Sequence, residues 1–284
     1  LAAEIKGFRD FAPNTLRGVI LNGVSKAMYP FYKAIAEQAG LTVYGCLPPV
    51  PEAEIPDRHL GLVTAQEIGD LQAKLDLLAD AAEEGLDLDG LLALAHTAPL
   101  LSDESAPLMP VADRPVRIAV ARDRAFCFYY ADNFDVLRAL GAEIVEFSPV
   151  ADEKLPEHID GLYLGGGYPE LYADRLQANT RTRDSIYAAV KSGMPTIAEC
   201  GGFQYLGQTL EGSKMCGVLP HDTNNTGKLV RFGYVDLISR VDSLFGPAGT
   251  HLRAHEFHYY DSSDNGDGFD AVKPSGKSWR AGVL

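Results

Sequence analysis

Short apolar runs alternate with helical patterns through the first part of the chain. The runs 17–22 and 41–45 each predict a buried strand, because they are short, apolar and bounded by polar residues or glycine. Between them, residues 29–39 carry apolar side chains at helical spacing and stop at Gly40. This strand–helix–strand unit predicts a parallel sheet, in which ligands gather at the carboxyl ends of the strands.

Helical spacing continues further along this part. Residues 71–94 are rich in Leu and Ala and predict one or two amphipathic helices, broken near Gly85 and Gly90. Thr64 to Glu67 has the spacing of a capping box at the start of a helix. Residues 96–114 carry several prolines and few periodic apolar side chains, which is typical of a linker between domains.

Beyond this linker the same alternation returns. The runs 117–121, 143–147 and 161–164 predict strands, while 129–140 and about 171–191 predict helices. Strands that alternate with helices in both parts predict an α/β protein with two doubly wound domains.

The net charge limits the kinds of partner that the chain can bind, and the cysteine content indicates the redox compartment. The 284 residues include 25 Lys and Arg against 39 Asp and Glu, a net charge of −14, which argues against nucleic acid or an anionic membrane surface as the main partner. No run approaches the length of a membrane span, and no signal peptide opens the chain. Cys46, Cys127, Cys200 and Cys216 are widely spaced without a CxxC pair, as is typical of a reduced cytoplasmic protein.

The best candidate for chemistry is Cys200. Residues 193–199 predict a short buried strand, and Gly201 and Gly202 then open a helix. A residue at such an elbow projects its side chain outward, and a helix N-terminus favours thiolate over thiol. The Gly201 N–H would point at an oxyanion formed on an attacked substrate. The alternative is a small buried cysteine in a tight packing turn.

A second glycine stretch, Gly165 to Gly167, follows the predicted strand at 161–164. A phosphate cradle is weakly supported, because the stretch lacks GxGxxG and no Lys follows it. If this strand neighbours the one before Cys200, the loop's N–H groups would complete an oxyanion hole with Gly201. A plain turn between strand and helix is the other alternative.

The histidines within 253–260 are the candidates for a base. This aromatic-rich segment predicts a strand, so Glu256 and His258 share one face while His255 and Phe257 share the other. His258 could then serve the thiol as a base, with Glu256 orienting it. The same alternation disfavours a zinc site, because it separates the two histidines. A purely structural histidine pair is the alternative.

The first part of the chain offers weaker candidates. Asn22 ends a predicted strand and could contact an adenine edge or simply lie in a turn. Arg58 and His59 could bind an anion, since Arg suits phosphate or carboxylate, or form a solvated pair in a loop.

Five stretches in order resemble the cobyrinic acid a,c-diamide synthase family. They are Arg58–Leu62, Ala121–Tyr130, Gly165–Leu171, Ala198–Leu206 and His255–Tyr259. The resemblance runs from about Arg17 to the end of the printed sequence. It implies part of a P-loop, dethiobiotin-synthetase-like ATP domain at 1–95. A class I glutamine amidotransferase domain of flavodoxin-like fold is implied at 115–284.

The resemblance also implies roles in the second domain. Cys200 matches the family nucleophile, and His258 matches the histidine that raises its nucleophilicity. Gly166 and Gly201 fall where the oxyanion donors belong.

On the synthetase side the resemblance implies less. Asn22 falls where the synthetase fold contacts adenine, and Arg58 and His59 lie in a family motif without an assigned role. The implied reaction amidates the a and c acetate side chains of cobyrinate, with glutamine as nitrogen donor and Mg²⁺ and ATP activating each carboxylate. Glutamine and a corrinoid carboxylate are the expected partners. The oligomeric state is left open, with a homodimer as one alternative. The alternatives are hydrogenobyrinate or nickel sirohydrochlorin as macrocycle, or a non-catalytic amidotransferase-like binding domain.

Three features depart from the pattern of the family or from that of most class I amidotransferases. No GxxxxGK[ST] motif occurs, and the chain starts at Leu1 with a polar, irregular stretch, so we expect a fragment that binds ATP weakly at most. Phe203 and Gln204 replace a more usual Leu-Met pair. Most class I amidotransferases have a His-x-Glu pair, which this branch lacks, and none follows Cys200 here. The orienting role of Glu256 is therefore inferred from the strand alone.

Overall fold

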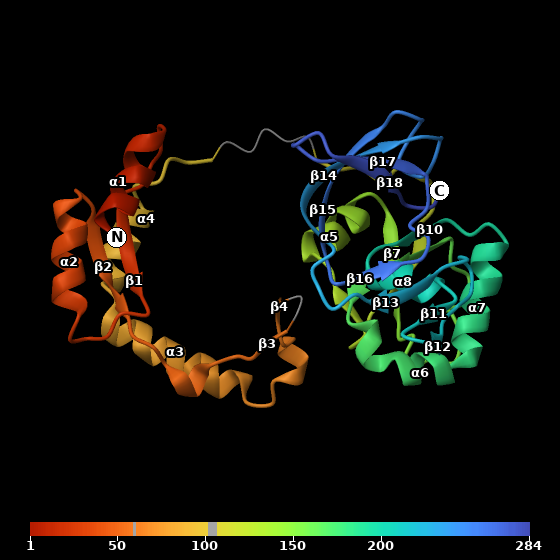
Figure 1. The fold of residues 1–284 in the computed structure, drawn as a ribbon, viewed down its shortest axis with the longest axis horizontal. Coiled ribbons are helices and arrows are strands. Elements are labelled where there is room, and N and C mark those ends of the chain that lie inside the picture. The colour runs from red at the N-terminus through yellow and green to blue at the C-terminus, as the bar shows by residue number, and fades with distance from the viewer. Residues whose placement is uncertain (59–60, 102–106) are drawn as a thin grey trace. The chain divides into compact units, whose positions relative to one another are not determined.

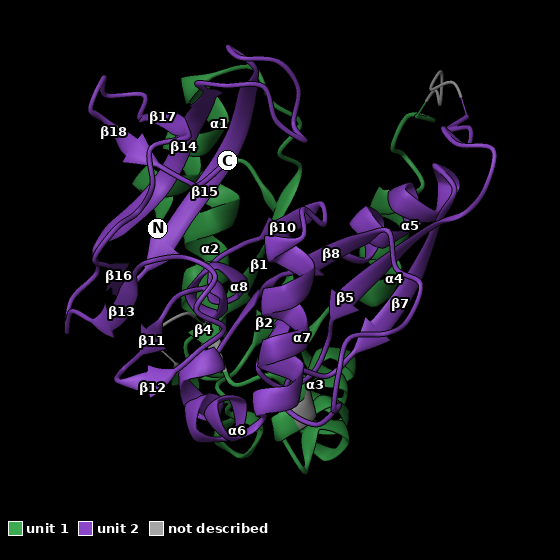
Figure 2. Ribbon diagram, turned by 90° about the vertical axis from the view of Figure 1, so that its right-hand side faces the viewer, with its two compact units in different colours: residues 1–105 green, residues 106–284 purple. Residues whose placement is uncertain are grey.

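The computed structural model describes residues 1–58, 61–101 and 107–284, without the side chains of Arg58, Leu62 and Gln66. The chain divides into two compact units, residues 1–105 and 106–284 (Figure 2). Each unit has its own buried hydrophobic cluster, so each is described by itself.

Unit 1 is built on a parallel strand pair. Strand β1 (Gly18–Asn22) pairs with β2 (Thr42–Leu47), and α2 (Tyr29–Gln38) connects them and packs against both (Figure 1). This confirms the predicted strand–helix–strand unit. The first residues form α1 (Ala2–Phe11), where an irregular stretch was expected, because Ile5 is buried in the cluster around α2.

The rest of unit 1 is mainly helical. After the short turn η1 (Pro51–Ala53) and the hairpin β3 (Asp57–Arg58) and β4 (Gly61–Leu62) come η2 (Ala65–Glu67), α3 (Leu71–Gly85) and α4 (Leu88–Ala95). The prediction that a capping box starts an α-helix at Thr64 is wrong. Thr64 Oγ1 donates to Glu67 Oε1 at 2.6 Å, but the residues after Thr64 form only one 3₁₀ turn. Gly90 also lies inside α4, where its N–H donates to Asp87 at 2.9 Å.

Unit 2 contains a four-stranded parallel sheet. Its strands are β5 (Val116–Ala121), β7 (Ala142–Phe147), β8 (Gly161–Leu164) and β10 (Thr196–Ala198), in the order β10-β8-β5-β7. This is the flavodoxin-like order. The crossovers through α5 (Ala131–Ala139) and α7 (Thr180–Lys191) run in opposite directions, which places these helices on opposite faces when both crossovers are right-handed. The predicted α/β class is therefore confirmed.

Further strands form two more four-stranded sheets, which are mainly antiparallel, and the sequence predicted only one of these strands, at 253–260. One sheet has the order β15-β14-β17-β18, formed by β14 (Arg231–Ser239), β15 (His251–His258), β17 (Phe269–Val272) and β18 (Ser278–Ala281). A smaller sheet joins β11 (Thr209–Leu210), β12 (Ser213–Lys214), β13 (Asp222–Asn225) and β16 (Tyr260–Ser262). The remaining elements are β6 (Phe126–Phe128), β9 (Gly166–Gly167), η3 (Pro169–Tyr172), α6 (Ala173–Ala178) and α8 (Gly201–Leu206).

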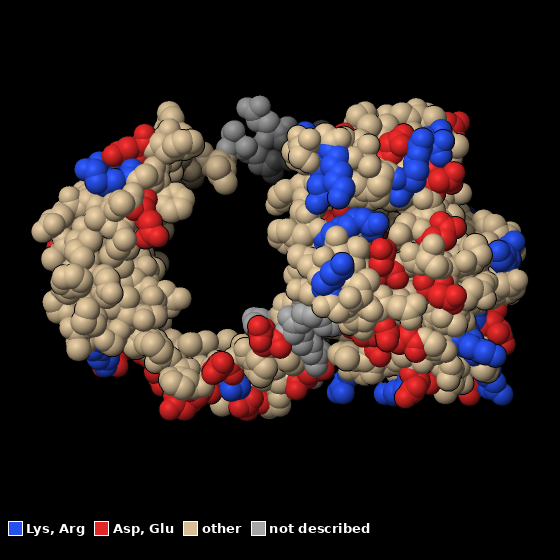
Figure 3. Space-filling model, viewed as in Figure 1, with Lys and Arg blue, Asp and Glu red and all other residues tan. Residues whose placement is uncertain are grey.

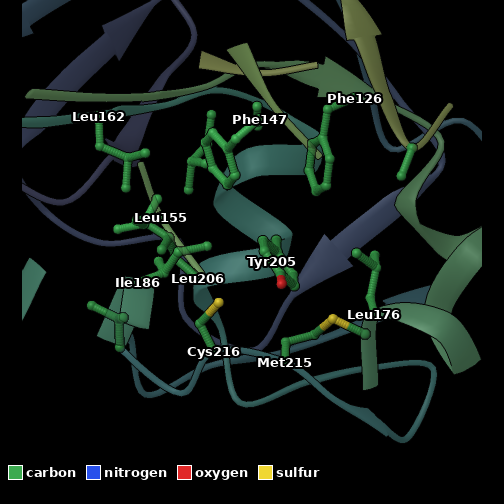
Figure 4. Close-up of a cluster of buried hydrophobic side chains, with 14 of the residues drawn as sticks. Phe126, Phe147, Leu155, Leu162, Leu176, Ile186, Tyr205, Leu206, Met215 and Cys216 are labelled. Carbon is green, nitrogen blue, oxygen red and sulfur yellow. The ribbon is translucent and has the colours of Figure 1, made fainter. Parts of the chain in front are cut away.

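The short helix α8 is anchored in the core of unit 2. Tyr205 and Leu206 point from it into a cluster with Phe126, Leu176 and Met215 (Figure 4). Phe126 and Tyr205 have ring centroids 5.4 Å apart, and both side chains are fully buried. Large buried side chains of this kind fix the position of the residues that precede the helix.

Charges are mixed on the surface. On the face of unit 2 seen in Figure 3, Lys and Arg side chains alternate with Asp and Glu side chains. Within the described residues, no helix combines the length and apolar character needed to cross a bilayer.

The packing of α8 predicts a sensitive glycine. A Cβ on Gly202 would lie 2.7 Å from Leu164 Cβ and still closer to the Leu164 carbonyl oxygen. We expect Gly202→Ala to destabilise the chain by about 1–3 kcal/mol through overpacking, measured by urea unfolding. Gly161→Ala is the matched control, because its Cβ would make an ordinary 3.5 Å contact with Pro195. Equal stabilities of the two variants would contradict this view of the turn.

Candidate active site

Cys200 lies at a strained elbow between β10 and α8. Its φ of 49° and ψ of −109° fall outside the regions that residues with a Cβ normally occupy. Backbone bonds hold the elbow on both sides: Glu199 N donates to Leu164 O at 2.9 Å, and Gly202 N donates to Gly165 O at 3.0 Å. Strain of this kind costs about 1–3 kcal/mol and is found mainly at functional sites.

The glycine stretch lies beside this elbow. β8 and β10 are parallel neighbours with Leu164 opposite Ala198, as predicted, so their carboxyl ends meet. The stretch is not a plain turn, because Gly166 and Gly167 form β9 and pair with β6. A Cβ on Gly166 would lie 3.4 Å from Cys200 Cβ, an ordinary contact distance, so Gly166 lies directly beside Cys200.

Two backbone N–H groups face the sulfur of Cys200. They belong to Gly201 and Gly167, and both lower the pKa of the thiol by hydrogen bonding to it. Gly201 was expected in this place, whereas the second donor is Gly167, next to the predicted Gly166. A pair of N–H groups beside a nucleophile can stabilise an oxyanion formed on the group that it attacks.

The expected stabilisation of a thiolate is not found. Although Cys200 is exposed as a residue, burial of its thiol dominates and raises its pKa. The carboxylates of Glu170 and Glu199 raise this pKa further, and together these effects outweigh the two N–H groups. Helix α8 has only six residues, so its dipole is short. The pKa of Cys200 therefore lies above its ordinary value, which favours the thiol over the thiolate.

His258 lies on the inner face of β15, as the predicted alternation requires. His258 and Glu256 are half-buried, whereas His255 and Phe257 are exposed. His258 Nδ1 lies 2.6 Å from the Tyr260 carbonyl oxygen, and Nε2 lies 3.9 Å from Glu256 Oε1. Among the described hydrogen bonds and ion pairs, none joins His258 to Cys200.

The protonated form of His258 is stabilised by these contacts. Burial lowers its pKa, but the Glu256 carboxylate and the Tyr260 carbonyl outweigh burial, so the pKa lies above its ordinary value. Because a carbonyl can only accept, Nδ1 carries the proton in the neutral ring, which leaves Nε2 as the basic nitrogen.

A cavity of about 290 Å³ brings Cys200 and His258 to one site. Its other lining side chains include residues that the sequence did not single out, because distant segments supply them: Arg231, Asp261, Asn265 and Trp279. Phe203 and Gln204 from α8 also line it.

Among the described residues, the candidate site residues of unit 1 do not line a common cavity. Asn22 is exposed at the end of β1, and the cavity of about 190 Å³ in this unit is lined by other residues, among them Lys26 and Glu84. Arg58 belongs to β3, but its side chain and all of His59 lie outside the described residues.

Comparisons with known proteins agree with one another. Residues 117–276 match the model of the CobB/CobQ-like glutamine amidotransferase domain. The cobyrinate a,c-diamide synthase of Listeria monocytogenes serotype 4b is 40% identical over 265 residues, which is 91% of this chain and 58% of that protein. The synthase of Syntrophotalea carbinolica is 38% identical over 294 residues, which is 99% of this chain and 61% of that protein.

The chain therefore spans about three fifths of the length of these relatives. Among solved structures, PurLQS from Thermotoga maritima matches with a TM-score of 0.40 and 20% identity, over 57% of this chain and 84% of that one.

The His258 environment yields a test in solution. Glu256→Gln removes the charge beside Nε2, so we expect the pKa of His258 to fall, as followed by NMR titration of the ring protons. The raised pKa contributes stability below the unfolded value of about 6.5, and this is lost as pH rises through the folded pKa. The variant should therefore lose more stability at pH 5 than at pH 8. Asp236→Asn, which removes the 2.6 Å partner of His251, is the control and should leave His258 unchanged. A His258 titration that is identical in Glu256→Gln and the parent would refute the assigned interaction.

Proposed function

Because this chain belongs to the CobB/CobQ-like glutamine amidotransferase family, we propose that unit 2 hydrolyses glutamine and that the whole protein uses the ammonia to amidate the a and c acetate groups of cobyrinate. The observation that carries the proposal is the strained elbow, which sets Cys200 between the N–H groups of Gly167 and Gly201. The similarity to cobyrinate a,c-diamide synthases supports the corrinoid as acceptor.

The glutaminase reaction begins at Cys200. Its sulfur attacks the side-chain carbonyl carbon of glutamine, and the thiol proton passes to His258 Nε2. The Gly167 and Gly201 N–H groups stabilise the oxyanion of the tetrahedral intermediate. His258 then gives its proton to the leaving nitrogen, so that ammonia departs and a γ-glutamyl thioester remains.

The second half of the cycle restores the thiol. Water attacks the thioester while His258 takes one of its protons, and this proton returns to sulfur as glutamate leaves. The raised pKa of Cys200 makes a base necessary in the first step. Nε2 has to turn from Glu256 toward the sulfur, and the Tyr260 carbonyl holds the opposite side of the ring meanwhile.

The described residues of unit 1 do not fit the phosphates of ATP. The sequence has no P-loop motif, and Lys26 at the cavity of this unit is paired with Glu84. Asn22 alone could contact a base but would not hold a triphosphate. Within the described chain, no group of three or more His, Cys, Asp or Glu side chains is placed to hold Mg²⁺.

The remaining assignments belong to the same proposal. Residues 1–95 would form part of the synthetase-like domain and 115–284 the amidotransferase domain, with 96–114 as linker. No disulfide joins the four cysteines, all of which are described, and this supports a reducing, cytoplasmic compartment.

A non-catalytic binding domain is the second candidate, since no described bond joins His258 to Cys200. A glutamine-like electrophile that forms a covalent bond to thiols separates the two. A working site reacts at Cys200 faster than at half-buried Cys127 or buried Cys46, whereas a silent site does not.

The nucleophile has a direct test. Cys200→Ser should abolish ammonia release from glutamine, because the hydroxyl is a far weaker nucleophile in this site, while circular dichroism stays unchanged. Cys127→Ser is the matched control and should retain activity. Full glutaminase activity in Cys200→Ser would rule out the assignment.

Substitutions of the two histidines on β15 test which of them acts as the base. His258→Ala should lower the glutaminase rate by roughly 10²–10⁴, the usual contribution of a general base. His255→Ala should have a much smaller effect, because its side chain lies on the exposed face of β15. The reverse order of effects would show that the faces of β15 are assigned to the wrong roles.

A further inference from the structure

His221 is a buried histidine that has no part in the proposed hydrolysis of glutamine. It directly precedes β13, and its side chain is only 2% exposed. The ring stacks on that of Phe203, with the centroids 4.3 Å apart and the planes inclined by 21°. Phe203 belongs to α8 and lines the cavity that contains Cys200, so the buried ring lies behind this part of the cavity wall.

The same histidine also contacts the far end of α8. A Cβ on Gly207, which follows the helix, would lie 2.6 Å from His221 Nε2 and 2.8 Å from the His221 carbonyl oxygen. That oxygen accepts from Gln208 N at 2.7 Å. A shift of this residue would therefore move a helix of only six residues, which begins directly after Cys200.

The surroundings of the ring favour its neutral form. His221 Nε2 is buried and has no hydrogen-bond partner among the described residues. A proton on this nitrogen would place a charged donor in the interior without an acceptor, which is costly. Burial accordingly lowers the pKa of His221, and the opposing effects of the Phe203 backbone and of the Asp264 and Asp222 carboxylates are smaller.

The carboxylates near the ring bond to other groups. Asp222, the first residue of β13, accepts from Thr209 Oγ1 at 2.6 Å, and Asp264 accepts from Gly266 N at 2.8 Å. On α8, the titratable Tyr205 points away into the core (Figure 4). No described carboxylate is therefore placed to accept a hydrogen bond from a protonated Nε2.

We propose that neutral His221 is a positioning residue for the nucleophile: it holds Phe203 and α8 in place, and a proton on its ring loosens this helix while the parallel sheet stays folded. The catalytic part of this inference rests on the proposed glutaminase function. An exposed histidine takes up a proton near pH 6.5, about its ordinary pKa, whereas the buried ring resists it. The stabilisation of α8 by His221 is therefore complete above about pH 6.5 and is lost as pH falls from there toward the folded pKa.

Amide hydrogen exchange, followed by NMR on the full chain, tests the loosening. The Gln204 N–H, bonded to Cys200 O at 3.1 Å, reports on α8, and the Leu162 N–H, bonded to Pro195 O at 2.9 Å, reports on the parallel sheet. The ratio of the two exchange rates removes the effect of pH on the exchange chemistry itself. Between pH 7.5 and pH 5.0 we expect the ratio of the Gln204 rate to the Leu162 rate to rise about tenfold.

Two variants identify the group that titrates. His221→Leu fills a similar space with a side chain that cannot bind a proton, so the rise should be absent. His251→Leu is the matched control, because His251 lies on the exposed face of β15, and it should show the same rise as the parent. Other groups, His258 included, titrate in the parent and in His221→Leu alike, so their effects cancel in the comparison.

A measurement on the parent alone covers the case in which His221→Leu does not fold. The exchange ratio should begin to rise near pH 6.5 and level off where the His221 ring protons titrate in the NMR spectrum. A ratio that levels off at the titration of another histidine would assign the loosening to that residue and overturn the role of His221.

The catalytic consequence is measured at pH 8 and saturating glutamine. His221→Ala should lower kcat for ammonia release about tenfold, because the Phe203 ring can move into the vacated space and α8 follows it. His221→Leu, which refills this space, should recover most of the loss, and His251→Leu should match the parent. Equal kcat values in His221→Ala and the parent would show that the ring does not position the nucleophile.

The outcomes separate this inference from the proposed glutaminase. If the parent releases ammonia but its exchange ratio stays constant, or rises equally in His221→Leu, the role of His221 is wrong and the glutaminase stands. Exchange of Gln204 and Leu162 that rises in parallel would mean that acid loosens the whole unit, which also overturns the inference. If the selective loosening appears but the parent releases no ammonia, His221 does hold α8 and the glutaminase is wrong.

Discussion

The active region of unit 2 depends on the contact between the backbone of α8 and the end of β8. Gly202 N donates to both Gly165 O and Glu199 O, and its Cα lies where any side chain would meet Leu164. This contact forces Cys200 into its left-handed conformation and sets it beside β9. Tyr205, buried one turn later, fixes the helix against the core. The positions of the Cys200 thiol, of the two N–H groups beside it and of one wall of the cavity therefore all depend on this contact between α8 and β8.

Local patterns in the sequence were sufficient to predict the strands of the parallel sheet in unit 2. Each strand of the β10-β8-β5-β7 sheet is a short apolar run bounded by glycine or polar residues, so its existence could be predicted without knowing its neighbours. The position of Cys200 at the elbow followed from the same pattern, because a short apolar run followed by Cys-Gly-Gly is typical of a strand that turns directly into a helix. The facing of His258 was predicted because the two-residue period of a strand holds regardless of tertiary structure.

Features that depend on distant segments could not be predicted. Arg231 and Trp279 reach the cavity only because β14 and β18 both pair with β17, and no local pattern states such pairings. The pKa of Cys200 was expected to fall, but it rises, since burial by surrounding segments outweighs a six-residue helix. The N–H of Gly167, next to the predicted Gly166, could not be located beside the sulfur from the sequence, because the register of β9 against β6 is set by tertiary contacts.

The conformation of Cys200 also bears on how this site is kept through evolution. A φ of 49° is comfortable for glycine, so replacing Cys200 with glycine would relieve strain and raise the stability of unit 2. Selection for folding alone would favour that replacement, and only selection for the chemistry of sulfur opposes it. If the proposed glutaminase chemistry is what keeps the cysteine in place, a lineage that no longer uses the thiol would gain stability by losing it.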